Sequence, residues 1–341
     1  SLVLKFFTPS IFLTLAAIIA AYYYLGIDAA ISTVILISIE VAFSFDNAVI
    51  NAKVLDRLSR FWQQLFLTVG MLIAIVGMRF IFPIVIVMVT SVQIWSAVID
   101  DALNNPAEYA KHLQEAHPTI SAFGGAFLMT LTAYFFLDTA RKELWLKKIE
   151  RNIQKFGGNI WLPPLLVLLI VIGAGFLVPS NEQIKVWQAG AAGVIVYTLI
   201  KLFIDALGKV AKLDGAAKYT GWGAFGAFIY LEILDASFSF DGVLGAFAIT
   251  DKVLIIALGL GVGAIWVRSL TIYMVRHGIL KSYKYLEHGA HYAIFFLALA
   301  LFAGLFLHVP EVVTGIAGIG VILASFFSSL EARKKSAIST S

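Results

Sequence analysis

The sequence predicts an all-α polytopic membrane protein with about ten transmembrane helices in two inverted-topology repeats. Three observations support this prediction. The 341-residue chain is 60% apolar and 13% charged, with a mean hydropathy of +0.90, whereas soluble domains are about 25% charged. Ten apolar segments have, or approach, the length needed to cross a bilayer. Two of these segments carry the same acidic motif.

A transmembrane helix needs roughly 20 apolar residues. The first apolar segment follows a lysine, as in a signal peptide, but no small-residue cleavage site follows it, so we interpret it as a retained helix. The predicted spans are 10–26, 29–52, 62–90, 119–139, 161–179, 187–207, 221–249, 253–275, 289–308 and 311–330.

The basic residues predict the orientation of these spans. With the N-terminus in the cytoplasm, 19 of the 25 Lys and Arg residues fall in cytoplasmic segments, and only Lys111, Lys185 and Lys252 fall in external loops. Cytoplasmic loops of membrane proteins are enriched in Lys and Arg. The sequence therefore predicts a multi-pass protein with both termini in the cytoplasm.

An internal repeat relates the second and third spans to the seventh and eighth. Both copies contain Phe-Ser-Phe-Asp, at 43–46 (the first motif) and at 238–241 (the second motif). In each copy a glycine and an arginine nine residues apart follow on the next span. An odd number of spans separates the copies, so they would cross the membrane in opposite directions, a plan common in secondary transporters.

The repeat also predicts the domain organisation. We expect residues 1–180 to form the first membrane repeat and residues 181–330 the second, inverted repeat, each with five helices. Residues 331–341 would form a cytoplasmic tail. In transporters of this plan the substrate site lies at the midplane, between the repeats.

Five carboxylates lie within the repeated spans, where each charge costs about 2.5–3.5 kcal/mol even on lenient insertion scales. Two arginines on the following spans, Arg79 and Arg268, cannot neutralise all five. A bound divalent cation or protons would compensate for the surplus; structural ion pairing alone is the alternative. The acids are Glu40, Asp46, Glu232, Asp235 and Asp241.

The spacing of these acids predicts that the motif helices are broken. Glu40 and Asp46 would point away from each other in a continuous helix, about 9 Å apart along its axis. The motif serines, Ser44 and Ser239, belong to a residue type that favours helix caps. We therefore expect unwound backbone at 43–47 and 238–242, with free carbonyls that can bind a cation.

The neighbouring residues favour oxygen ligands. The chain has no Cys and only five Met, which excludes thiolate ligands, whereas Asn47 and Asn51 add amide oxygens after the first motif. Carboxylate and amide oxygens suit Mn²⁺, Mg²⁺ or Ca²⁺. His291, near the cytoplasmic end of the ninth span, is either a proton or metal group or an ordinary interfacial histidine.

These motifs resemble the TerC integral membrane family of the LysE-type exporter superfamily. The resemblance rests on Glu40 with the first motif and Asn47, on Glu232 and Asp235 with the second motif, and on the Gly-to-Arg helices. It implies export of divalent metal, chiefly manganese, across the bacterial plasma membrane. It also implies the ligands Glu40, Asp46, Asn47, Glu232, Asp235 and Asp241. The family usually has Ser or Asn where this chain has Gly242, so one ligand is missing.

The expected function is therefore non-enzymatic: a secondary transporter that exports Mn²⁺, with Ca²⁺ or Mg²⁺ as other cargo and with exchange for protons as an option. No permanently bound cofactor and no nucleic-acid partner are expected, and the sequence does not predict an oligomeric state. One alternative is a non-transporting membrane partner in metal stress or in the metalation of secreted proteins. Others are an exporter of organic solutes and an intramembrane aspartyl protease, in which two aspartates share a proton.

Overall fold

The computed structural model describes residues 2–210, 218–219, 221–246 and 249–339. Within these residues the chain is almost entirely helical, and the only β pairing is an isolated bridge between Leu58 and Tyr219. The chain forms two compact units. Each unit is built from three separate stretches of sequence.

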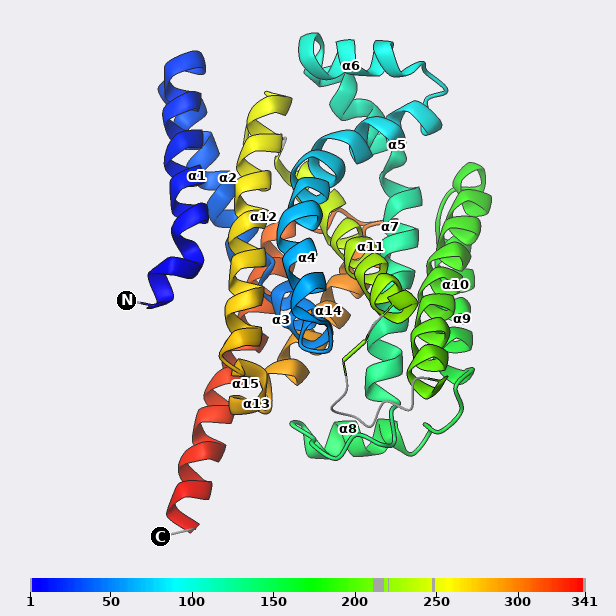
Figure 1. Cartoon of the computed structure of the whole chain (residues 1–341). Coiled ribbons are helices and arrows are strands. Elements are labelled where there is room, and N and C mark those ends of the chain that lie inside the picture. The colour runs from blue at the N-terminus through cyan, green and yellow to red at the C-terminus, as the bar shows by residue number, and fades with distance from the viewer. Residues whose placement is uncertain (1, 211–217, 220, 247–248, 340–341) are drawn as a thin grey trace. The chain divides into compact units, whose positions relative to one another are not determined.

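The first unit comprises 1–48, 58–117 and 218–273. Within it α1 packs along α2, and α11 contacts η1 and α4 (Figure 1). Its helices are α1 (Leu2–Leu25), α2 (Ile27–Phe43), the start of α3 (Phe45–Leu55), α4 (Arg60–Leu72), the π-helix η1 (Ile73–Ile81), α5 (Phe82–Thr90), α6 (Trp95–Asn104), the first part of α7 (Pro106–Phe136), α11 (Gly221–Ala246) and most of α12 (Val253–Arg276).

The second unit comprises 49–57, 118–217 and 274–341. Within it α9 lies beside α10, and α14 packs on α15 (Figure 1). Besides the remaining parts of α3, α7 and α12, it contains α8 (Lys147–Gln154), α9 (Leu162–Leu177), α10 (Ser180–Val210), α13 (Ile279–Ser282), α14 (Leu286–Ala303) and α15 (Glu311–Ser339).

Seven helices of the described chain are long and apolar enough to cross a membrane, or eight if the bent pair α2–α3 is one span. Many large apolar side chains on these helices are exposed, such as Phe12 at 69% on α1 and Ile316 at 62% on α15. Soluble monomers rarely expose so much contiguous apolar surface. These helices indicate a multi-pass membrane protein in a lipid bilayer.

Each of the ten predicted spans coincides with helix in the structure, but two of these helices are not among the candidate spans. The 16-residue α9 is about 24 Å long, shorter than a hydrocarbon core of about 30 Å. The other, α11, carries Glu232, Asp235 and Asp241. The compact units combine segments from both halves of the sequence, so the division into two repeats stays a prediction.

The break in the motif helix occurs at the first motif only. There the unwound stretch is shorter than the predicted 43–47: α2 ends at Phe43, Ser44 alone forms a turn, and α3 begins at Phe45 with a bend of 55°. The predicted break at 238–242 is wrong, because α11 continues to Ala246. The Ser239 hydroxyl donates to the Asp235 carbonyl one turn earlier. This bond belongs to a continuing helix, where a serine side chain need not cap an end.

Candidate functional site

The first motif places Asp46 at the start of a helix. The Ser44 backbone N–H donates to the Glu40 carbonyl at 3.1 Å and completes the last turn of α2. Asp46 then lies in the first turn of α3, where one carboxylate oxygen accepts the Asn47 backbone N–H at 2.9 Å. Negative charge is stabilised at a helix N-terminus, because unpaired N–H groups and the helix dipole point toward it.

Arg79 joins the acids of the two motif helices. Its Nη2 donates to Glu40 of α2 at 2.5 Å, and its Nη1 donates to Asp235 of α11 at 3.0 Å. All three side chains are at most 10% exposed. A buried ion pair has to offset the desolvation of both charges, so removing one partner strands the other.

Arg268, from α12, binds Glu232, another acid of α11. Its guanidinium binds both carboxylate oxygens of Glu232 at 3.2–3.3 Å and lies 3.6 Å from Asp235. It also stacks 4.0 Å from the centre of the Phe66 ring and donates to the Phe66 carbonyl at 3.1 Å. Asp235 therefore lies between two arginines. We call Glu40, Arg79, Glu232, Asp235 and Arg268 the ionic cluster.

Two glycines allow the helices of the ionic cluster to approach. A Cβ at Gly70 would lie 2.6 Å from Arg268 Nη1 and 2.8 Å from Glu232 Oε1. A Cβ at Gly263 would lie 2.5 Å from the Cβ of Glu40. Gly70 is the glycine of the repeated Gly-to-Arg pattern. Its role in the structure is to leave room for a buried ion pair.

The helix that carries Arg79 has a π-helical segment, which sequence reasoning missed. Residues Ile73–Ile81 form η1, and Arg79 Nη1 also donates to the Ala74 carbonyl at 3.3 Å. Pro83 follows at the start of α5. Proline has no N–H to donate and clashes with the carbonyl four residues earlier, which here belongs to Arg79. Pro83 was the signal available in the sequence, because a proline disturbs the helical hydrogen bonds of the turn before it. π-Helical turns of this kind are often found at functional sites.

Asp46 and Asn47 provide oxygen atoms that the arginines do not satisfy. The Asn47 amide nitrogen donates to Asp235 at 3.2 Å, but its Oδ1 is buried and has no hydrogen-bond partner in the described structure. Asp46 is 7% exposed, and the described residues supply no cation to it. Buried polar groups without partners are uncommon in native structures. These two side chains are the part of the site that can accept a cation or a proton.

No group of three or more His, Asp or Glu side chains in the described part of the chain is arranged to hold a metal ion. Three of the four acids whose side chains are described here are engaged by arginine. Asp241 lies in α11, but its side chain is outside the described residues. Of the predicted metal ligands, Glu40, Glu232 and Asp235 are linked through Arg79 and Arg268. Asn47 contacts Asp235 directly, and its backbone N–H binds Asp46.

Two other predicted residues belong to the second unit. Asn51 is buried in α3, and its Oδ1 has no partner among the described residues. His291 stacks on Phe135 with ring centres 3.6 Å apart, and its Nδ1 lies 2.8 Å from the Glu287 carbonyl. Glu287 in turn is paired with Lys53. The two motif serines make hydrogen bonds within their own helices: the Ser44 backbone N–H donates to the Glu40 carbonyl, and the Ser239 hydroxyl donates to the Asp235 carbonyl.

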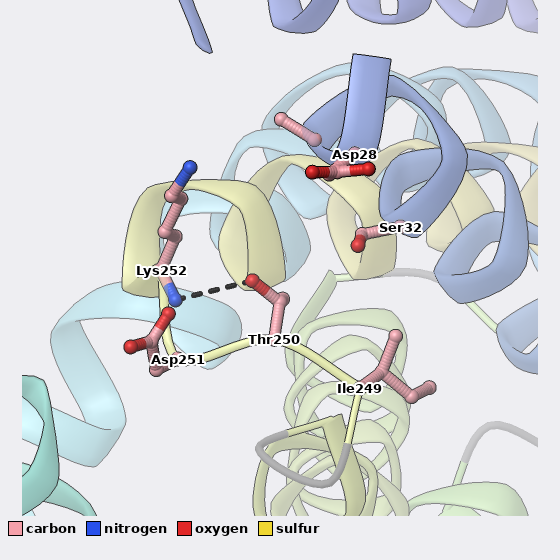
Figure 2. A pocket seen from close by; sticks show the side chains of 7 residues that line it. Asp28, Ser32, Ile249, Thr250, Asp251 and Lys252 are labelled. Carbon is pink, nitrogen blue, oxygen red and sulfur yellow. Dashed lines mark hydrogen bonds between the residues drawn. The ribbon is translucent and has the colours of Figure 1, made fainter. Parts of the chain in front are cut away.

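A cavity of about 370 Å³ opens in the first unit, at the start of α2. Figure 2 shows Asp28 and Ser32 of α2 opposite the connection between α11 and α12, where the Lys252 backbone N–H donates to Thr250. No residue of either motif lines this cavity. Glu40 is 12 residues beyond Asp28, about 18 Å along the helix, so the cavity and the ionic cluster are separate features.

The chain matches the family model described as "Protein of unknown function (DUF475)" over residues 45–336. This range covers most of the chain, which therefore belongs to the DUF475 family. It includes Asp46, both arginines and the second motif. No curated protein and no solved structure matches the chain.

Proposed function

We propose that this DUF475 protein is a secondary transporter that exports a divalent metal ion, Mn²⁺ foremost, across the bacterial plasma membrane. The proposal includes ten spans in two inverted repeats, both termini in the cytoplasm and kinship with the TerC exporters. The metal is the cargo, and no enzymatic role is assigned. Ca²⁺ and Mg²⁺ are the other ions that the same oxygen ligands suit.

The observation that carries this proposal is the pair of buried oxygen groups at the first motif. Asp46 and the Asn47 Oδ1 lie at a helix break without a cationic partner among the described residues. Burying a carboxylate and an amide oxygen in this way is costly unless a partner arrives. A hard divalent ion or a proton on Asp46 would supply that partner.

The ionic cluster can supply further ligands only if arginine leaves them. Glu40 and Asp235 flank the first motif but are bound by Arg79 at 2.5 and 3.0 Å. In our proposal the metal and Arg79 compete for these carboxylates, and the structure corresponds to the state in which arginine holds them. Exchange of metal for arginine or proton would couple metal release to a conformational change.

A second candidate function is a membrane partner that does not transport. The arginine contacts favour it, because two guanidinium groups already satisfy Glu40, Glu232 and Asp235. In this alternative the ionic cluster only holds the helices together. The Asn47 Oδ1, which has no hydrogen-bond partner among the described residues, and the Asp46 carboxylate, to which they supply no cation, favour transport over this alternative.

Metal flux into proteoliposomes tests the proposal. The purified full chain is reconstituted with a Mn²⁺-sensitive dye inside, with and without a pH gradient. Asp46→Asn is compared with the matched control Asp205→Asn, which changes an aspartate of the second unit that pairs with Lys201 at 2.9 Å. We expect Asp46→Asn to abolish flux and Asp205→Asn to retain it.

The outcome also separates the two candidate functions. Flux of Mn²⁺ that responds to pH and is lost in Asp46→Asn supports a proton-linked transporter. Folded wild-type protein that carries no Mn²⁺, Ca²⁺ or Mg²⁺ in either direction contradicts the transport proposal and favours the membrane partner. Full flux in Asp46→Asn would contradict the role of the first motif.

A further inference from the structure

The connection between α7 and α9 lies beside the end of a candidate membrane span. Helix α7 ends at Phe136, and the apolar α9 begins at Leu162. Between them α8 runs crosswise to α9 and α10 (Figure 1). A helix that runs across the spans at their ends is positioned to lie along the membrane surface.

Buried contacts fix one side of this connection to the second unit. Glu150, the only acid of α8, is fully buried. It accepts hydrogen bonds from Arg141 at 2.5 Å and from the backbone of Trp145 and Leu146 at 3.2 and 3.0 Å. His288 of α14 lies 3.6 Å from the same carboxylate. Sequence reasoning missed Glu150, although a single acid within a basic run was a visible signal.

The exposed residues of the connection are mostly basic or apolar. Five exposed cations lie on it, and none of them makes an ion pair in the part of the chain that the structure describes. Large apolar side chains stand among them, with Phe156 73% exposed and Trp161 55% exposed. We call this exposed set the α8 surface; its cations are Lys142, Lys147, Lys148, Arg151 and Lys155, and its apolar residues are Leu146, Ile149, Phe156, Ile160 and Trp161.

We propose that the α8 surface binds anionic phospholipids of the adjacent leaflet. Its charge is complementary to acidic headgroups, which attract basic segments close to a membrane surface. Its exposed aromatic and aliphatic side chains suit the boundary between headgroups and acyl chains. A water-soluble acidic partner would match the cations but would leave the large apolar side chains among them, such as Phe156 and Trp161, exposed to water. This proposal does not depend on metal transport.

Site-specific labelling tests the proposal on the full chain. The sequence contains no Cys, so Phe156→Cys carries a single thiol for an environment-sensitive fluorophore on the α8 surface. The labelled protein is placed in nanodiscs that contain brominated phosphatidylglycerol or brominated phosphatidylcholine at equal mole fractions. We expect the anionic lipid to be preferred by about fivefold or more, the factor that one basic residue contributes near an anionic surface.

A charge-matched pair of variants shows whether the cations cause the preference. The triple change Lys147→Gln, Lys148→Gln, Arg151→Gln should remove it, whereas Arg333→Gln, Lys334→Gln, Lys335→Gln on α15 should keep it. Equal quenching by both lipids in the wild type would overturn the anionic preference. No quenching by either lipid would overturn lipid contact altogether and point to a water-soluble partner instead.

Discussion

The two Phe-Ser-Phe-Asp motifs have the same four residues and different backbones. At the first motif the helix breaks at Ser44 and Asp46 begins a new helix. At the second motif α11 is continuous, and the acids that precede the motif, Glu232 and Asp235, bind two arginines. The first motif therefore presents oxygen atoms without a cation, whereas the second lies in a helix whose two described acids, Glu232 and Asp235, are paired with arginine.

This difference shows that the four residues of the motif do not by themselves determine whether the helix breaks. Ser44 makes no side-chain cap, and its N–H closes the turn on Glu40. Ser239 instead bonds back to Asp235 through its hydroxyl. The position of each helix relative to Arg79 and Arg268 then decides which acids are paired. Five substitutions test this contrast, and they follow from the largest expected effect to the smallest.

Arg79→Ala should have the largest effect, because Arg79 binds an acid from each motif helix. Its loss would leave Glu40 without its ion-pair partner and Asp235 with Arg268 alone. Breaking a buried pair costs about 3–5 kcal/mol. We expect little folded protein, measured as a lower melting temperature and yield in detergent. Arg79→Lys, which keeps the charge, should recover part of both; equal stability of wild type and Arg79→Ala would show that the pairs contribute nothing.

Asp235→Asn and Asp46→Asn should separate the two motif helices. Asp235→Asn removes a carboxylate that faces two arginines and should destabilise the fold by about 3 kcal/mol. Asp46→Asn removes a buried charge without a cationic partner and should leave the melting temperature unchanged or raised, while metal flux is lost. Thermal unfolding of both variants measures the change in stability that each substitution causes. A larger loss of stability in Asp46→Asn would contradict the contrast.

Gly70→Ala should destabilise the cluster moderately, because its Cβ would lie 2.6 Å from Arg268 Nη1. Overpacking of this kind costs about 1–3 kcal/mol. Gly77→Ala, whose nearest neighbour would be Ile73 at 3.4 Å, is the matched control and should be neutral. Equal melting temperatures for the two variants would show that the close approach at Gly70 is relieved without cost.

Ser239→Ala should have the smallest effect. It removes a side-chain bond to the Asp235 carbonyl, which already belongs to a helix, and a bond of this kind contributes about 0.5–1.5 kcal/mol at most. We expect a melting temperature within a few degrees of the wild type and unchanged metal flux. A large loss of flux would show that Ser239 acts at the site rather than along the helix.

Sequence reasoning identified the helices and the acids, because apolar length and buried charge are local properties. From the same six-residue spacing it predicted unwound backbone at 43–47, where the helix breaks at Ser44, and at 238–242, where α11 is continuous. It recognised Arg79 and Arg268 as possible partners but gave no reason for Arg79 to bind acids of both motif helices. That choice depends on how α2, η1 and α11 approach one another, and on the room that Gly70 and Gly263 leave. Tertiary packing of this kind has no signature in a single sequence.

The π-helical segment at Ile73–Ile81 has a consequence for motion. Its hydrogen bonds join residues five apart, whereas α-helical bonds join residues four apart. Conversion of this segment to α-helix would change every bond by one register position. It would also rotate the part of the helix that follows the segment by about 100° relative to the part that precedes it. Arg79 lies inside the segment, so a change of pitch within a single helix would be enough to take its guanidinium away from Asp235.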